Sequence, residues 1–300
     1  MAVAVRRYAR DDLGMLNQKA FQRRGVLRRF GSASGWLERG EQIAVLSVAE
    51  AVRGAPILDI GVGGGRTAPL MREISTDYRG IDFAPKMIAT ARARFPTLDF
   101  RKMDARHLEF GDGSFALATF SYNGIDAVDL EGRRAVMREV HRVLRPGGYF
   151  VFSALNRNGS EWLPRWPNWE VFQGAGLRPL RLLRATAKLL LSGFNRLRWS
   201  GTGSDGAEAS IGSLAVHNFS LVTMFTSPLG TLRQIQEAGF KVEAMYDPDG
   251  AELPLEDKKN SSAPWYYVVA RKDERSSAVT GQPSPLHAVK TRILPGVSTN

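Results

Sequence analysis

Residues 61–65 read GVGGG and directly follow PILDI, an apolar run that contains one acid, Asp59. Glycine adopts left-handed backbone conformations at little cost and leaves the main chain uncovered. A buried strand that runs into such a turn before a helix lets a ligand lie against bare backbone, with the helix amides pointing at it. This stretch therefore predicts a strand, a loop and a helix that together bind a ligand through the main chain.

Short apolar segments alternate with amphipathic segments on both sides of the glycines. Strands are predicted at 56–60, 78–82, 98–103, 114–121 and 148–154, with helices near 66–74, 85–94 and 130–144. Such alternation is typical of a doubly wound α/β fold, in which right-handed crossovers place helices on both faces of a parallel sheet. Ligands bind at the carboxyl ends of these strands, and the glycines stand at such an end.

The rest of the chain predicts additions to this core. The alternation stops after residue 154 and resumes with a helix at 228–238 and strands at 240–246 and 265–271. We expect the following parts: an N-terminal helical cap (1–53), a ligand-binding core (54–154), an inserted lid or substrate region (155–226), the C-terminal part of the core (227–272) and a disordered tail (273–300).

Cysteine is absent, which excludes disulfides and thiolate metal sites. No apolar stretch approaches the roughly 20 residues that span a bilayer, and the first residues lack a signal-peptide core, so a cytoplasmic protein is expected. The formal charge of +11 is concentrated in residues 1–30, with eight Lys and Arg, and in 176–200, with six and no acid. These segments are either solvated helix faces or surfaces for an anionic substrate, nucleic acid or a membrane.

Two cofactor families use a glycine turn of this kind. The dinucleotide fingerprint G-x-G-x-x-G fails here because Arg66 stands where the third glycine belongs. The spacing is instead D-x-G-x-G-x-G, carried by Asp59, Gly61, Gly63 and Gly65, and it resembles the class I S-adenosylmethionine-dependent methyltransferases. The segments YRGIDFAPKMI, RKMDARHLEF, ALATFSYNGIDAV, HRVLRPGGYFVFSA and SPLGTLRQIQEAGF resemble further parts of that family in the same order.

The resemblance implies a Rossmann-like sheet of seven mostly parallel strands with the last strand antiparallel, and S-adenosylmethionine as cofactor. Asp82 would hold both ribose hydroxyls, or it merely caps the next helix. Asp59 would bind the cofactor's amino group or support the glycine loop. Asp104 would accept from the adenine amino group, or it belongs to a turn. The remaining cofactor contacts would come from Gly61, Gly63, Gly65, Phe83, Met87, Ala105 and Ser121.

Methyl transfer from a sulfonium depends mainly on alignment, so a general base is helpful but not obligatory. The candidate catalytic residues are His217, which lies between the insertion and the final helix, and Asp126 and Tyr122, which follow the fourth strand. Either His217 or Asp126 could serve as the base. Asp126 and Asp129 lack a further ligand nearby, so no metal is expected.

The insertion holds WLPRWPNW at 162–169 and a basic, leucine-rich helix at 177–199. Both fit a lid over a bulky acceptor, and aromatic faces and arginines favour a plausibly anionic one. We expect methyl transfer to an oxygen or nitrogen of a small molecule, a glycan or a lipid-linked compound. RNA methylation and cofactor binding without catalysis are the alternatives. The amphipathic helix also allows peripheral contact with a membrane.

Overall fold

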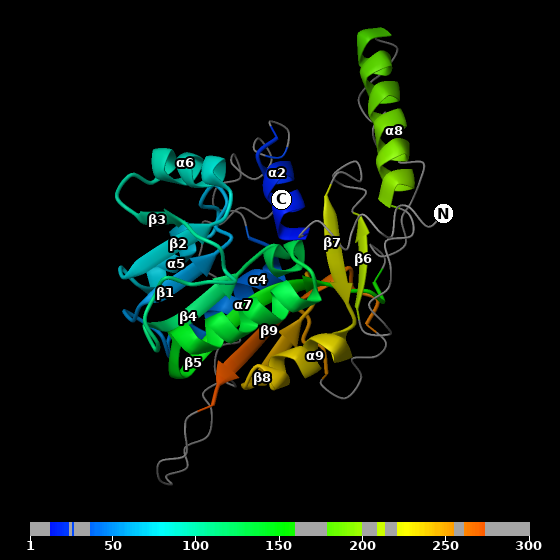
Figure 1. Ribbon diagram of the computed structural model, residues 1–300. Coiled ribbons are helices and arrows are strands. Elements are labelled where there is room, and N and C mark those ends of the chain that lie inside the picture. The colour runs from blue at the N-terminus through cyan, green and yellow to red at the C-terminus, as the bar shows by residue number, and fades with distance from the viewer. Residues whose placement is uncertain are drawn as a thin grey trace.

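The computed structural model describes residues 13–23, 26, 37–159, 179–199, 209–213, 221–254 and 261–273. Its centre is a seven-stranded sheet in the order β3-β2-β1-β4-β5-β9-β8 (Figure 1). The strands are β1 (Ile57–Ile60), β2 (Tyr78–Asp82), β3 (Asp99–Lys102), β4 (Phe115–Phe120), β5 (Leu144–Leu155), β8 (Phe240–Tyr246) and β9 (Trp265–Lys272).

Only β9 in this sheet runs against its neighbours, because it pairs antiparallel with both β5 and β8 while the pairs from β3 to β5 are parallel. The Rossmann-like sheet with an antiparallel last strand is therefore confirmed. The glycine loop follows β1 near the middle of the sheet. β2 lies on one side of β1 and β4 lies on the other, so the strand order runs toward opposite edges of the sheet from this point. Ligands bind at such a switch point in open α/β sheets.

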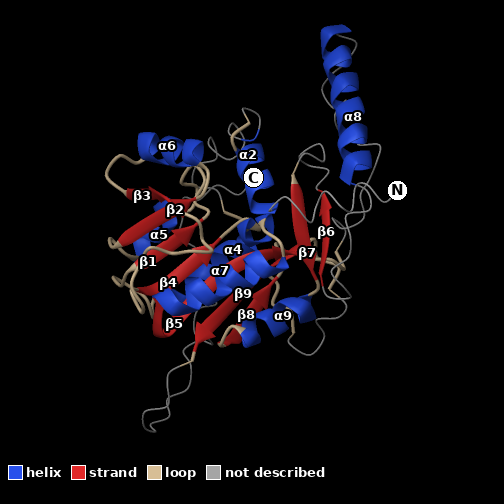
Figure 2. Cartoon of the chain, in the orientation of Figure 1, coloured by secondary structure: helices blue, strands red, loops and turns tan. Residues whose placement is uncertain are grey.

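Helices cover both faces of the sheet (Figure 2). One apolar cluster joins α7 (Leu130–Val143) and α9 (Pro228–Glu237) to one face, and the other joins α4 (Arg39–Ala49), α5 (Ala68–Ile74) and α6 (Pro85–Arg94) to the opposite face. Successive side chains of a strand point to opposite faces, so Leu58 belongs to the first cluster and Ile57 to the second.

The remaining elements are α2 (Leu13–Phe21), the 3-10 helix η1 (Gly124–Ala127), α8 (Pro179–Trp199), β6 (Ala209–Ser213) and β7 (Val222–Thr226). β6 and β7 form a separate antiparallel pair inside the region expected to be a lid. The sequence analysis predicted neither strand, and β6 reads ASIGS, which lacks the β-branched and aromatic pattern of a strand. In the described part of the chain, no helix combines the length and hydrophobicity needed to cross a membrane.

Candidate functional site

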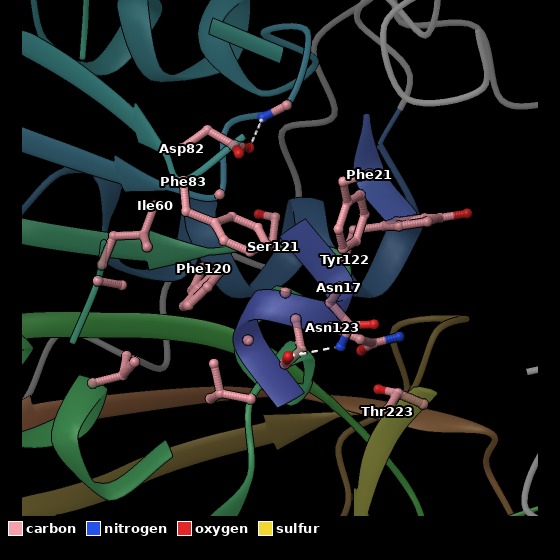
Figure 3. A pocket seen from close by; sticks show the side chains of 18 of the residues that line it. Asn17, Phe21, Ile60, Asp82, Phe83, Phe120, Ser121, Tyr122, Asn123 and Thr223 are labelled. Atoms are coloured by element: carbon pink, nitrogen blue, oxygen red, sulfur yellow. Dashed lines mark hydrogen bonds between the residues drawn. The ribbon is translucent and has the colours of Figure 1, made fainter. Parts of the chain in front are cut away.

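A cavity of about 290 Å³ lies at the carboxyl ends of β1, β2 and β4 (Figure 3). α2 and β7 supply further wall residues, although they are far from the central strands in the sequence. Of the residues expected to bind a cofactor, the cavity brings together Gly61, Gly63, Asp82, Phe83, Met87, Asp104, Ala105 and Ser121. Asp59 and Gly65 are not among the residues that line it.

The glycine loop uses conformations that other residues rarely adopt. Gly61 and Gly63 have φ values of +64° and +55°, and both line the cavity. A Cβ atom on Gly61 would lie 2.5 Å from Cε2 of Phe120. The side chain is therefore excluded at Gly61 by an aromatic ring of the protein, while the other side of the loop stays open to the cavity.

Asp82 ends β2 and is 6% exposed, with its carboxylate on the cavity wall (Figure 3). Oδ2 accepts from the Gly63 amide at 2.9 Å, and Oδ1 accepts from the Ala84 amide at 2.8 Å. Burial raises the pKa of Asp82 to about 6, although both amides work in the opposite direction. Each oxygen keeps a lone pair after these bonds, so the carboxylate can accept from a ligand as well as steady the loop.

Asp59 is 1% exposed and does not line the cavity. Its carboxylate accepts hydrogen bonds from the hydroxyls of Thr67, Tyr78 (2.9 Å) and Thr119 (3.0 Å). Burial raises its pKa, and the three hydroxyls oppose that shift. Of the two roles expected for Asp59, this geometry favours support of the loop, because three partners tie the end of β1 to β2, β4 and the residue before α5.

Asp104 lies on the cavity wall and is paired with Arg106. Oδ2 receives the guanidinium at 2.8 Å and Oδ1 receives the Arg106 amide at 2.9 Å. Burial works to raise the pKa of Asp104, but the hydrogen bonds from Arg106 outweigh it and the pKa is lowered. Asp104 thus makes the contact expected of a turn residue and also lines the cavity. Because its pKa is lowered, its carboxylate stays ionised at neutral pH.

The loop after β4 is strained. Tyr122 and Asn123 both line the cavity and have φ values of 53° and 58°, a conformation that costs non-glycine residues energy. The guanidinium of Arg66 lies 5.2 Å from the centre of the Tyr122 ring and forms a buried bidentate ion pair with Glu41. The Oδ1 atom of Asn123 is buried without a hydrogen-bond partner. A water molecule or a polar group of a ligand could satisfy this oxygen.

Of the three candidate catalytic residues, the structure describes Tyr122 and Asp126, and they lie in different surroundings. Tyr122 is on the cavity wall, and His217 lies outside the described residues. Asp126 faces away from the cavity into the interior, where Arg133 and the Leu155 amide (2.7 Å) hold its carboxylate. The expectation that Asp126 would face the reacting groups does not match this placement, because η1 turns its side chain toward α7.

Several residues of the cavity wall belong to no recognisable sequence motif, so the sequence did not indicate them. Asn17 and Phe21 come from α2, and Thr223 comes from β7. The Nδ2 atom of Asn17 donates to the carbonyls of Ala127 and Val222, both at 2.7 Å, which fixes α2 across this end of the cavity (Figure 3). Among the residues that the structure describes, no three histidine or acidic side chains gather as metal ligands would.

Comparison with known proteins finds that part of the chain is similar to methyltransferases. Residues 57–148 match a family model described as "Methyltransferase domain". The chain is 34% identical over 112 residues to a demethylmenaquinone methyltransferase of Chlorobaculum parvum (36% of this chain, 45% of the relative). It is 32% identical over 145 residues to a ubiquinone biosynthesis O-methyltransferase of Cereibacter sphaeroides (42% and 57%).

Similarity to solved structures extends over more of the chain. The CcbJ methyltransferase of Streptomyces caelestis has the same fold, with a TM-score of 0.52, 16% identity, and coverage of 80% of this chain and 91% of that one. By sequence, in contrast, the chain spans about half the length of the curated relatives it matches.

Proposed function

We propose that the chain binds S-adenosylmethionine as class I methyltransferases do and methylates a small-molecule acceptor, because residues 57–148 match a family model described as a methyltransferase domain. The observation that carries the cofactor assignment is the Asp82 carboxylate, which reaches the cavity beside the bare backbone of Gly61 and Gly63. A carboxylate accepts two hydroxyls of a ribose diol at once, and charge-assisted hydrogen bonds are the stronger kind.

The residues around Asp82 fit an adenosyl group in polarity and shape. Phe83 and Met87 supply apolar surface for a ring, and Phe21 closes on Phe83 with 5.8 Å between ring centres. Asp104 and the Ala105 amide fit the edge of the base. When bound, S-adenosylmethionine supplies an electrophilic sulfonium methyl group. The chain's task is then to hold the acceptor in line and to keep water out, and such orientation alone can contribute about 7–11 kcal/mol.

We propose an uncharged, ring-containing acceptor that is methylated on an oxygen or a nitrogen atom. The end of the cavity away from Asp82 favours an acceptor of this kind. Its described wall is formed by Asn17, Tyr122, Asn123, Ala127, Val128, Leu155, Leu221, Val222, Thr223 and Trp265, none of which carries a charge at neutral pH. Apolar pockets with a few polar groups orient small ligands in this way. The anionic acceptor was expected from the tryptophans and arginines of the insertion; residues 162–169 lie outside the described part of the chain, and no described charged side chain lines this end of the cavity. The quinone-related names of the two curated relatives are compatible with a ring-containing acceptor.

Asn123 and Tyr122 are the polar groups we propose for positioning the acceptor. The unpartnered Oδ1 atom of Asn123 accepts from an acceptor hydroxyl or amine, and the Tyr122 hydroxyl supplies a second contact. His217 remains a proposed general base. RNA methylation and binding without catalysis remain alternatives that fewer observations support.

The cofactor assignment is tested by Asp82→Asn, which keeps the shape but removes the charge. We expect the dissociation constant for S-adenosylmethionine to rise at least about tenfold, the loss expected for charge-assisted hydrogen bonds. Titration calorimetry measures the dissociation constant, and Asp112→Asn is the control because that side chain is 80% exposed and does not line the cavity. Equal affinities in wild type and Asp82→Asn would remove Asp82 from the cofactor site.

The acceptor assignment is tested by S-adenosylhomocysteine release with two panels, hydroxylated or aminated aromatic compounds and phosphorylated sugars. We expect turnover with aromatic compounds, and a rise in their KM of roughly threefold to tenfold in Asn123→Leu with unchanged cofactor affinity. Thr223→Val is the matched control, because its hydroxyl already donates to the Asp126 carbonyl at 3.0 Å. Preference for the phosphorylated panel, or an unchanged KM in Asn123→Leu, would contradict the proposal.

A further inference from the structure

α8 stands apart from the helices that cover the sheet. It has 21 residues and rises from the end of the molecule that holds β6 and β7 (Figure 1). Its side chains are described from Pro179 to Phe194. Within that span, the burial of each side chain separates the helix into three faces.

The first face is already packed. Ala185 and Ser192 are 4% and 0% exposed, and Leu182 and Leu189 are half-buried. Successive residues of an α-helix are about 100° apart, so these four side chains share one side. An amphipathic helix of a globular protein needs only one such apolar side for its attachment.

The second face is apolar and exposed, and we call it the α8 ridge. It consists of Leu180 (69% exposed), Leu183 (67%), Leu190 (69%), Leu191 (54%) and Phe194 (63%). These side chains fall within an arc of about 100° on the side away from the packed face. In the described part of the chain, they are five of the six large hydrophobic side chains that are exposed. The attachment of α8 to the protein does not account for them, and contiguous apolar patches of this kind mark interaction surfaces.

The third face is basic and lies between the other two. Arg181, Arg184 and Lys188 are exposed along the border of the ridge. Residues 176–200 contain no Asp or Glu, so this border has a single sign of charge. An apolar arc edged by cations matches the boundary between acyl chains and anionic headgroups.

We propose that α8 docks flat on a membrane surface that carries anionic lipids, with the ridge among the acyl chains and Arg181, Arg184 and Lys188 at the headgroups. Two copies of the chain that buried the ridge against each other would bring like charges together, whereas a lipid surface pairs them. α8 contacts β6, β6 pairs with β7, and β7 carries Val222 and Thr223 into the cavity wall. The docked helix is thus joined to the cavity through two strands.

The test is co-sedimentation of the full chain with vesicles of phosphatidylcholine, with and without phosphatidylglycerol. We expect binding to the anionic vesicles to fall at least about tenfold in Leu183→Ser/Leu190→Ser/Phe194→Ser, because each exposed side chain loses its burial in lipid. In Arg181→Gln/Arg184→Gln/Lys188→Gln, we expect binding to the anionic vesicles to fall about fivefold for each cation removed. This difference from wild type should shrink as salt is added.

The matched control is Arg53→Gln/Arg138→Gln/Lys241→Gln, which removes the same formal charge from other exposed positions. We expect it to bind within about twofold of wild type, because these positions lie away from α8. Unchanged melting temperatures would show that the variants fold. The proposal would be overturned if the wild-type chain did not bind anionic vesicles, or if the ridge variants bound them as strongly as wild type. It would also be overturned if the ridge variants changed only self-association.

Discussion

Asp59 in β1 and Asp82 at the end of β2 have different surroundings, and only Asp82 reaches the cavity. The Asp82 carboxylate lies on the cavity wall, where each of its oxygens accepts a hydrogen bond from one backbone amide. Asp59 is turned toward three hydroxyls inside the protein. The sequence placed both acids beside the glycine loop but left the role of Asp59 open. Which face of a strand a residue occupies depends on register, and the partner hydroxyls come from distant parts of the chain.

A pH dependence of cofactor affinity follows from the buried Asp82 carboxyl, whose pKa is about 6. The ionised form accepts two hydroxyls, so binding favours it. Below that pKa the carboxyl must first release its proton, and affinity falls by up to tenfold per pH unit. Above it, affinity is constant. Calorimetry between about pH 5 and 8 in two buffers of different ionisation enthalpy measures both affinity and proton release.

The control for this profile is Asp82→Asn, which lacks the titrating group and has a flat profile over the same range. A wild-type affinity that stays level down to pH 5, with no proton released, would exclude the buried carboxylate as the ribose partner.

At the scale of the elements, α7, η1 and α9 are locked together by one buried arginine. Arg133 is 0% exposed and pairs with Asp126, while it also donates to Gln234 at 2.7 Å and Thr231 at 3.2 Å. The bounds of the elements around it follow the sequence closely: the predicted strand 240–246 coincides with β8, and the helix at 228–238 extends one residue beyond α9. The ion pair itself was not foreseen, since an arginine in a helix is usually at the surface.

Arg133→Met is expected to lower the free energy of unfolding by about 3–5 kcal/mol, because it leaves the buried Asp126 carboxylate without its charge partner. Urea denaturation measures this loss. Arg138→Met on the same helix is the control, since its pair with Glu131 is 60% and 70% exposed and contributes about 0–1 kcal/mol. Equal losses in the two variants would show that burial of the pair has no bearing on stability.

At the scale of the whole molecule, the cavity is assembled from parts that are far apart in the chain. Asn17 of α2 bonds to the Val222 carbonyl 205 residues away, and this contact places an N-terminal helix beside β7 at one end of the cavity (Figure 3). The membrane surface proposed for α8 lies beyond β6, outside the sheet and its covering helices (Figure 1). The ligand site therefore combines residues of the core with residues of the segments added to it, whereas the proposed docking surface belongs to an added segment alone.

The sequence by itself determined the core of this protein. Strand and helix periodicity, the glycine turn and the acid that ends β2 are local patterns, and each follows from backbone sterics and burial over a few neighbouring residues. Tertiary structure alone decided that Asp126 turns inward, that Asn17 and Phe21 reach the cavity, and that β6 pairs with β7. The physical reason is that these contacts join residues far apart in sequence, and the energy of such a contact depends on packing that no local pattern records.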